Sequence, residues 1–512
     1  MDTQKLTGQD MVKDNQLFYI EDFEELFADV QLQHVFADQK TFPDAVPKSP
    51  VSEILEAYRI AKHTTGFNLT HFVETHFEIP QKNEHHFISD ASLSPKEHIN
   101  KLWDVLTKHT QDNYGTLIPL PKNFVVPGGR FRETFYWDTY FTMLGLQAAG
   151  RIELIENMVD NFAYLIDTFG FVPNGNRTYF LSRSQPPFFA LMIELLSEEK
   201  GEEILIKYLP QLRKEYQFWM KGVSIVSHDH TAHEHCVLMP DGSVLNRYWD
   251  SLNMPRPEGY DIDLKIAAAA QGTTGEIFRN IRAACESGWD FSGRWMKDHK
   301  NIETINTTEL IPIDLNCLLY NLETVLVKAY SLLENSQAGA WYQQQANARA
   351  ASIQQYLWNN DKATYFDYNH ISKQHTGVDT IASAFPLFFN MAKSAQANAV
   401  LQNIEQKFLQ AGGLLTTLAN TGQQWDDPNG WAPLQWIGYK AALNYKNKTL
   451  ALQIKKNWIS NVEKQYKATG KMMEKYNVMD TSSTASGGEY ENQDGFGWTN
   501  GVYLKMVSED NQ

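Results

Sequence analysis

The sequence predicts an all-α protein built as one large domain. Apolar residues recur at helical spacing through most of the chain from about Ser52 onward. Alternating patterns typical of strands are few, and no Pro- or Ser-rich linker divides the chain. Loops rich in Gly, Pro, Trp and Asn join the helical segments, and such loops often carry function. A ring of paired helices with its loops over one end satisfies these observations, as do a bundle and a solenoid.

The elements follow in chain order. Residues 1–40 are acidic and weakly patterned, which predicts an N-terminal arm, and residues 41–512 are predicted to form the single domain. Apolar residues step by three or four through 154–169, where Gly170 and Pro173 end the helix, and again from Leu318 to Leu332. An Asp-Gly turn within residues 235–248 predicts a β-hairpin. Further helices are predicted near residues 188–198, 203–220, 338–358, 392–410, 433–446 and 449–467.

The composition excludes several classes of partner. The chain has 512 residues with 45 basic and 61 acidic side chains, a net charge of −16, whereas nucleic acids and anionic membranes need a dense cationic face. No apolar stretch reaches the roughly 18 residues of a membrane span. Aromatic residues reach 12%, which suits a buried core and also a sugar site, where flat rings stack on pyranose faces. We expect a monomer that binds a small molecule.

The cysteines and the N-terminus bear on location. Three cysteines lie far apart without a CxxC motif, which indicates reduced thiols. Residues 1–20 have neither a basic nor an apolar segment typical of a signal peptide. We therefore expect a cytoplasmic protein, with the periplasm as the alternative if an export signal has been removed.

Three loops carry the chemistry: residues 127–140, 424–433 and 487–501. Each interleaves aromatic rings with Arg, Asp, Glu, Asn or Gln, a mixture that suits a neutral polyhydroxyl ligand. No GxxxxGK[ST] motif is present, which argues against a phosphate cradle. Residues 228–236 contain four histidines and Cys236, but the spacing is not HExxH, and a solvated loop is the favoured interpretation. No metal and no cofactor are expected.

The segments PGGRFRETFYWDTY (127–140) and QWDDPNGWAP (424–433) resemble the two signature segments of the inverting trehalase family of glycoside hydrolases. Five further segments resemble the same family in the same order, from about residue 40 to 505: PNGNRTYFLSRSQPP, PRPEGY, ESGWDFSGRW, IPIDLN and GGEYENQDGFGWTNGV. The resemblance implies an (α/α)6 barrel with catalytic loops over one end. It also implies hydrolysis of α,α-trehalose to two glucose molecules by a single, inverting displacement without a metal.

The resemblance further implies the catalytic pair. The general acid is Asp290 of the ESGWDFS segment, and the base is Glu489 of the GGEY segment. An inverting glycosidase needs one carboxyl to protonate the glycosidic oxygen and one carboxylate to activate water on the opposite ring face. Glu491 is a rival base, because two residues apart in an extended segment point to the same side.

The remaining site residues are also carried over from the resemblance. Substrate contacts are expected at Arg130, Trp137, Asp138, Asn174, Arg183, Ser184, Gln185, Arg256, Pro257, Glu258 and Gly288. The arginines among them supply forked donors to hydroxyls and can hold carboxylates ionised. The acid needs its pKa raised, which burial beside Trp289 would achieve.

Some residues in these segments have a plainer interpretation. Asp314 and Asn316 could reach substrate, but capping a helix from Cys317 is favoured. Asp426 and Asp427 could serve only to shape their own loop. Trp425 and Trp431 could serve only as packing residues of the core. Arg130 could pair with an acidic neighbour in its own segment, Glu133 or Asp138, instead of binding sugar.

Two other functions stay open at this stage. Another (α/α)6 glycosidase, such as a glucoamylase-like enzyme, would cut a different α-glucoside. A catalytically silent sugar-binding protein would keep the pocket, although the presence of both carboxyls counts against it.

Overall fold

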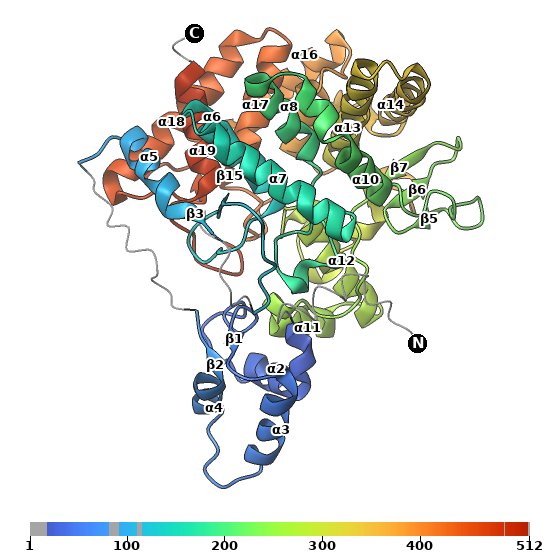
Figure 1. Ribbon diagram of the computed structural model, residues 1–512. Coiled ribbons are helices and arrows are strands. Elements are labelled where there is room, and N and C mark those ends of the chain that lie inside the picture. Colours follow the sequence, from blue (N-terminus) through green and yellow to red (C-terminus); the bar gives the residue numbers. More distant parts are fainter. Residues whose placement is uncertain (1–17, 81–91, 110–114, 486, 510–512) are drawn as a thin grey trace.

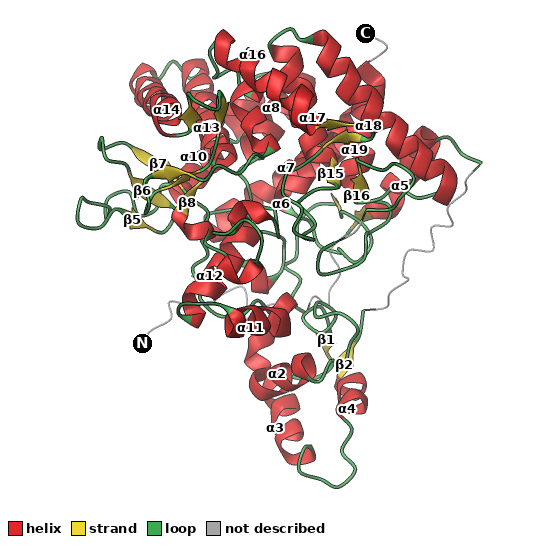
Figure 2. Ribbon diagram, turned by 180° about the vertical axis from the view of Figure 1, so that it is seen from behind, coloured by secondary structure: helices red, strands yellow, loops and turns green. Residues whose placement is uncertain are grey.

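The computed structural model describes residues 18–80, 92–109, 115–485 and 487–509. Helices dominate this part of the chain, which confirms the all-α prediction (Figures 1 and 2). The main helices are α5 (Pro95–Leu106), α6 (Tyr136–Ala148), α7 (Ile152–Phe169), α8 (Phe189–Lys200), α9 (Glu203–Lys207), α10 (Leu209–Trp219), α11 (Tyr260–Ala269), α12 (Thr274–Glu286), α13 (Ile313–Leu332), α14 (Ser336–Tyr356), α15 (Phe385–Phe388), α16 (Ser394–Asn403), α17 (Ala432–Asn444), α18 (Lys448–Thr469) and α19 (Gly497–Ser508).

The helices pack in pairs, and the first and last helices of the ring lie against each other. α13 packs on α14, α17 on α18, and α19 on α6. The contact between α6 and α19 needs glycine on both sides. A Cβ at Gly145 would lie 2.5 Å from the Cα of Gly501, and a Cβ at Gly501 would lie 2.0 Å from the carbonyl oxygen of Phe141. The two backbones can therefore approach closely enough to close the ring.

The predicted helices are confirmed, but two of the predicted segments are interrupted. The apolar residues predicted at 154–169 lie in α7. Gly170, whose φ of 88° places it in the left-handed region, ends this helix. The segment 203–220 divides into α9 and α10, because Pro210 lacks the N–H that a continuous helix would need and instead stands in the first turn of α10. The segment 392–410 is α16 followed by one π-helical turn, Ile404–Phe408.

The strands are short and lie both among the helices and at their outer side (Figure 2). The predicted hairpin is confirmed: β6 (Cys236–Leu238) pairs antiparallel with β7 (Val244–Asn246), and β5 (Ala232–His233) adds a third strand. β15 (Asn429–Trp431) pairs with β16 (Lys475–Asn477) beside the cavity described below. The other strands are β1 (Val46–Pro47), β2 (Phe77–Glu78), β3 (Thr107–Lys108), β4 (Phe124–Val125), β8 (Leu310–Ile311), β9 (Trp358–Asn359), β10 (Thr364–Tyr365), β11 (Tyr368–Asn369), β12 (Gln374–His375), β13 (Leu409–Gln410) and β14 (Gly413–Leu414).

Residues 18–80 form a small N-terminal module that projects from the ring beside α11 (Figure 1). It contains a 3-10 turn (Ile20–Phe23), α2 (Glu24–Leu32), α3 (Val51–Ala61), α4 (Leu69–His76) and the pair β1–β2. Its apolar side chains, Phe27 and Phe42 among them, form a cluster that is separate from the main core. The division of the chain at residue 40 stays a prediction, and residues 1–17 of that segment lie outside the described part.

Candidate active site

A cavity of about 350 Å³ lies among the loops and gathers most of the residues that the sequence singles out. Those that line it are Arg130, Trp137, Asp138, Asn174, Arg183, Gln185, Arg256, Glu258, Gly288, Asp290 and Glu489. Ser184 and Pro257 are not among the lining residues. The Ser184 hydroxyl donates to the carbonyl of Val172 at 2.7 Å, and the carbonyl of Pro257 accepts from Gln31 at 2.7 Å.

Asp290 stands in the loop that follows α12, and the neighbouring loop holds its backbone in place. Gln424 Nε2 donates to the carbonyl of Asp290 at 2.6 Å. Asp426 accepts from the Ser292 hydroxyl at 2.7 Å and from the Gly293 amide at 2.8 Å. These bonds confirm that Asp426 builds the loop, and they also fix the segment that carries the predicted acid.

The surroundings of Asp290 favour its protonated form near neutral pH. Burial raises the pKa of Asp290 to about 7; the Arg256 guanidinium opposes this rise, and the Glu489 carboxylate adds to it. Gly288, two residues earlier, has φ 74°, and a Cβ there would lie 2.8 Å from the indole of Trp137. The glycine therefore lets the acid-bearing loop pack directly against an aromatic wall of the cavity.

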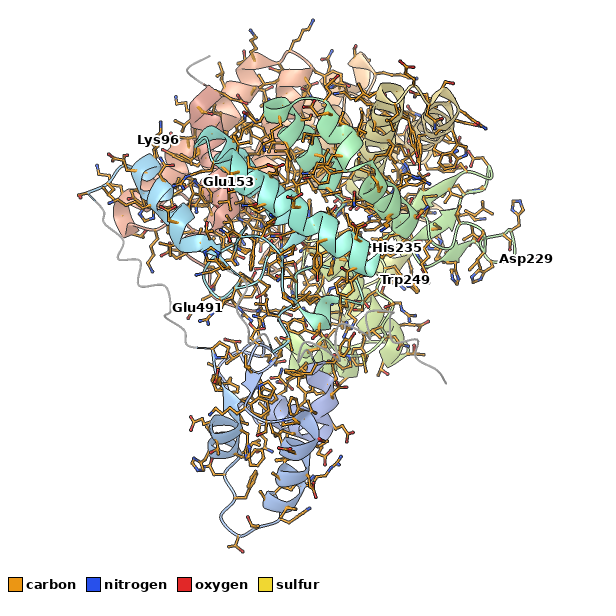
Figure 3. All side chains as sticks on the ribbon, in the orientation of Figure 1. Lys96, Glu153, Asp229, His235, Trp249 and Glu491 are labelled. Atoms are coloured by element: carbon orange, nitrogen blue, oxygen red, sulfur yellow. The ribbon has the colours of Figure 1, made fainter. Side chains whose placement is uncertain are left out.

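Glu489 lines the cavity and is held by an arginine. Arg256 Nη2 lies 2.9 Å from Glu489 Oε1, and the same nitrogen lies 2.6 Å from Oδ1 of the buried Asp263. Glu491, the rival base, is exposed and does not line this cavity (Figure 3). Of these two glutamates, only Glu489 can face a ligand there.

Sequence reasoning missed one further carboxyl in the cavity, Glu474, which directly precedes β16. Its side chain is 2% exposed, and Oε1 accepts from the Tyr490 hydroxyl at 2.9 Å. Oε2 has no hydrogen-bond partner among the described residues, and Lys475 Nζ lies 3.8 Å away. Burial raises the pKa of Glu474 above its ordinary value. The available signal was a Glu-Lys pair flanked by apolar and aromatic residues, Met472, Met473 and Tyr476.

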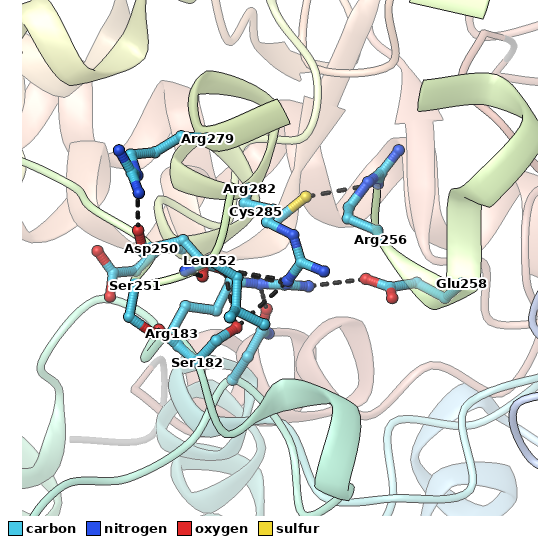
Figure 4. A network of polar contacts seen from close by, with 12 residues as sticks. Ser182, Arg183, Asp250, Ser251, Leu252, Arg256, Glu258, Arg279, Arg282 and Cys285 are labelled. Carbon is cyan, nitrogen blue, oxygen red and sulfur yellow. Dashed lines mark hydrogen bonds and ion pairs between the residues drawn. The ribbon is translucent and has the colours of Figure 1, made fainter. Parts of the chain in front are cut away.

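Two buried arginines hold carboxylates of the cavity, as expected. Figure 4 shows the contact of Arg183 with Glu258. Arg183 donates to Glu258 at 2.7 Å and to the Asn174 amide oxygen at 2.8 Å. Burial alone would raise the pKa of Glu258. The nearby Arg183 and Arg256 guanidinium groups outweigh burial and hold this pKa below its ordinary value. Glu258 is therefore ionised at neutral pH.

Arg130 has an acidic partner that the sequence did not indicate. Its Nη2 lies 3.6 Å from Asp38 of the N-terminal module, and its guanidinium lies 4.9 Å from the centre of the Tyr490 ring. Glu133, the neighbour considered as its partner, is instead 2.7 Å from Lys40. Asp138, the other neighbour, is buried, and burial raises its pKa well above the ordinary value, an effect to which the Glu474 and Asp290 carboxylates add.

Stacked indoles form an apolar wall. The rings of Trp425 and Trp431 are 3.9 Å apart at 4°, and Trp289 stacks on the other side of Trp425 at 5.6 Å and 12°. Trp425 and Trp431 both line the cavity. They therefore pack on each other and also present aromatic surface to a ligand.

The capping prediction for Asp314 and Asn316 is wrong. α13 begins at Ile313, so both residues lie in its first turn. Asp314 accepts two hydrogen bonds from the buried Arg294 at 2.8 and 2.9 Å. The Asn316 amide donates to the carbonyl of Asn246 at 2.9 Å, and neither residue lines the cavity.

The histidine-rich segment forms a projecting loop, with Asp229 near its tip and His235 at its base (Figure 3). His235 is buried, and its Nε2 lies 3.1 Å from Glu286, while His230 and His233 approach each other at 3.4 Å. Within the described residues, no group of three or more His, Cys, Asp or Glu side chains could hold a metal ion.

Known proteins match nearly the whole chain. The family model described as Trehalase matches residues 34–511. A periplasmic trehalase of Salmonella agona is 46% identical over 485 residues, which cover 94% of this chain and 85% of the relative. Similarly named proteins of Salmonella paratyphi B and Salmonella schwarzengrund have the same identity and coverage.

Solved structures share the fold. Neutral trehalase Nth1 from Saccharomyces cerevisiae superposes with a TM-score of 0.63 at 24% identity, covering 82% of this chain and 80% of that one. A GH63 mannosylglycerate hydrolase from Thermus thermophilus in complex with glucose gives 0.55 at 14% identity, covering 81% and 100%. The fold is thus the predicted (α/α)6 barrel. The family model and the 46% identical relatives define the protein as a glycoside hydrolase. Within that class, the chain belongs to the trehalase family.

The relatives also bear on location. They are named periplasmic trehalases, which does not support the cytoplasmic location expected from the sequence. In the part of the chain that the structure describes, every helix is too short or too polar to cross a membrane.

Proposed function

We propose that this protein hydrolyses α,α-trehalose to two glucose molecules by a single, inverting displacement. The observation that carries the proposal is the cavity in which a buried Asp290, with a pKa of about 7, lies among carboxylates held by arginines. Inverting glycosidases need such a pair of unequal carboxyls, one protonated and one ionised. The family match supplies the substrate.

Asp290 acts as the general acid in this proposal. A pKa of about 7 leaves much of the Asp290 population protonated at neutral pH, so it can donate to the glycosidic oxygen as the bond breaks. The charges of Arg256 and Glu489 act on it in opposite directions, which leaves burial as the dominant influence. The departing glucose keeps its α configuration because its anomeric carbon is not attacked.

For the base, the surroundings favour Glu474 over Glu489, the residue expected from the sequence. Both carboxylate oxygens of Glu489 already accept hydrogen bonds from Arg256, at 2.9 and 3.4 Å. Glu474 is buried, and its Oε2 has no hydrogen-bond partner among the described residues, with the Lys475 ammonium 3.8 Å away as an ion-pair partner. That oxygen can therefore accept a proton from water. The raised pKa of Glu474 also makes it more basic than an exposed carboxylate.

The remaining lining residues would bind the two glucose rings through hydrogen bonds and aromatic stacking. Trehalose is uncharged, so Arg183 would bind its hydroxyls through N–H donors rather than through charge. Arg256, whose donors already serve Asp263 and Glu489, would act by orienting those carboxylates. Trp425 and Trp431 offer flat apolar faces to the pyranose rings. Glu258 and Glu489, oriented by these arginines, add acceptors for hydroxyl groups.

An assay of glucose release tests the proposal. Purified protein should release glucose from trehalose and not from maltose, and Asp290→Asn should abolish that release while leaving the protein folded. Turnover of maltose but not of trehalose would make the protein a glycosidase that cuts a different α-glucoside. Binding of trehalose without turnover by the wild type would make it a silent sugar-binding protein.

We further propose that the protein works in the periplasm, the alternative location. The names of its relatives support this choice. Fractionation of the native cells should recover trehalase activity in the periplasmic fraction, and activity confined to the cytoplasmic fraction would restore the first expectation. A monomeric state stays a prediction.

A further inference from the structure

The N-terminal module supplies one wall of the active-site cavity. The chain between α2 and β1 enters the cavity and contributes six lining residues: His34, Phe36, Ala37, Asp38, Gln39 and Lys40. They lie in the same cavity as Asp290 and Glu489. The module is thus part of the site and not only an appendage of the barrel.

Hydrogen bonds fix this wall to a segment that bears predicted substrate contacts. Gln31 Nε2 donates to the carbonyl of Pro257 at 2.7 Å and to the carbonyl of Gln39 at 2.8 Å. The Gln39 side chain in turn accepts from the Asp261 amide at 2.8 Å. The position of residues 34–40 is therefore tied to the segment that carries Arg256 and Glu258.

A buried charge network anchors the other end of the wall. Lys40 is 4% exposed and contacts Asp44 within the module and Glu133 of the barrel, the latter at 2.7 Å. Arg177 lies 3.3 Å from Asp44 and 3.4 Å from Glu133. Because removal of one member leaves buried charges unpaired, this network holds the module firmly on the barrel.

A second cavity, of about 700 Å³, adjoins the first. The two share six lining residues: Ala37, Asp38, Lys40, Arg130, Glu489 and Tyr490. Charged groups of both signs, among them Arg132, Lys471 and Asp494, line the second cavity, and such a surface can bind sugar hydroxyls as well as water. The shared residues mark the boundary between the two spaces.

We propose that the contact between Asp38 and Arg130 partitions the two cavities and thereby restricts the substrate to a disaccharide. Both residues line both cavities, and their side chains are 3.6 Å apart and only partly exposed, at 31% and 20%. In this proposal, a third glucose unit attached to trehalose would extend toward the second cavity and meet this pair. The N-terminal module would then determine the chain length that the site accepts, an inference that rests on the proposed trehalase function.

The substitution must open the partition without unfolding its turn. Asp38 Oδ1 accepts from the amides of Lys40 and Thr41, each at 2.9 Å, so the residue also shapes the local backbone. Serine is smaller and its hydroxyl can accept the same amides. Asn retains the volume and the turn but loses the charge that attracts Arg130. Glu53→Ala, on the exposed face of α3, is a matched control in the same module.

The experiment compares two substrates in each variant: trehalose, and trehalose extended on one ring by an α-1,4-linked glucose. The readout is the ratio of kcat/KM for the trisaccharide, followed as maltose released, to kcat/KM for trehalose. We expect a low ratio in the wild type and in Glu53→Ala, a rise of roughly tenfold or more in Asp38→Ser, and a smaller rise in Asp38→Asn.

An unchanged ratio in Asp38→Ser, with trehalose turnover retained, would overturn the inference and leave the proposed function intact. If the serine variant has a lowered melting temperature, Asp38→Asn decides, and an unchanged ratio there would also overturn the inference. Failure of the wild type to cleave trehalose would instead refute the proposed function.

Discussion

Arg256 reaches Glu489 with both terminal nitrogens, at 2.9 and 3.4 Å, while it also donates to the buried Asp263. One guanidinium thus joins a residue of the carboxy-terminal loop to one on α11. The geometry depends on the planar fork of arginine, which an ammonium group cannot reproduce. Arg256 therefore orders one side of the cavity before any substrate is present.

We expect Arg256→Ala to lower kcat/KM by an amount equivalent to about 2–4 kcal/mol of transition-state binding free energy. Arg256→Lys should lose much of the same free energy. The lysine keeps the charge but can serve only part of the contacts to Asp263 and Glu489. The alanine variant should also melt at a lower temperature, because Asp263 would be buried without its partner. Kinetics and calorimetry on both variants test this. Near wild-type activity of Arg256→Lys would show that only the positive charge matters.

Activity should fall as pH rises through about 7. The general acid must be protonated, and the pKa of Asp290 is raised to about 7 mainly by burial. Above that pH, kcat/KM should drop roughly tenfold per pH unit. The acidic limb should report the base, whose raised pKa moves that limb upward if it is Glu474. A profile flat to pH 9 would contradict the assignment of the acid.

Asp290→Asn should stabilise the protein above neutral pH although it removes activity. Because the folded-state pKa of Asp290 lies above the ordinary 3.8, the folded state binds this proton more tightly than the unfolded state. Its contribution to stability is therefore lost as pH rises from about 4 to about 7. The variant should gain at most about 4 kcal/mol at pH 8, and almost nothing at pH 4. Denaturant unfolding at both pH values measures the difference, and equal stabilities at pH 8 would contradict the cited pKa.

The two candidate bases can be separated by azide rescue. Glu474→Gln should lower kcat by roughly 10²–10⁴-fold, and azide, a small anion that replaces the activated water, should restore turnover. Glu489→Gln should raise KM and lower kcat without rescue, because it loses an acceptor and a partner of Arg256. Glu491→Gln is the matched control on the same loop. Rescue confined to Glu489→Gln would return the role of base to Glu489, and rescue confined to Glu491→Gln would assign it to the rival.

Local patterns predicted much of the fold and part of the site. The stripe ending at Gly170 and the Asp-Gly turn of the β6–β7 hairpin depend on neighbours in sequence, and both are confirmed. The break at Pro210 was missed because the apolar pattern continues across it. The sequence favours a capping role for Asp314, because its actual partner, Arg294, meets it only when the two segments pack.

The unpredicted parts of the site all depend on contacts between distant segments. Glu474 carries no distinctive motif, and its burial arises from the packing of β16 against β15 and of Tyr490 above it. Asp38 meets Arg130 only because the N-terminal module docks on the barrel. Glu491 was considered because residues two apart in an extended strand share a side, but no strand forms there.

The central claim is a single displacement at one anomeric carbon, and the stereochemistry of the first products tests it most directly. Proton NMR at early times, before mutarotation, should show α-glucose and β-glucose in equal amounts. Water attacks one ring from the face opposite the leaving group, and the other ring departs unchanged. Release of α-glucose alone, or a trapped glycosyl-enzyme, would contradict the inverting mechanism.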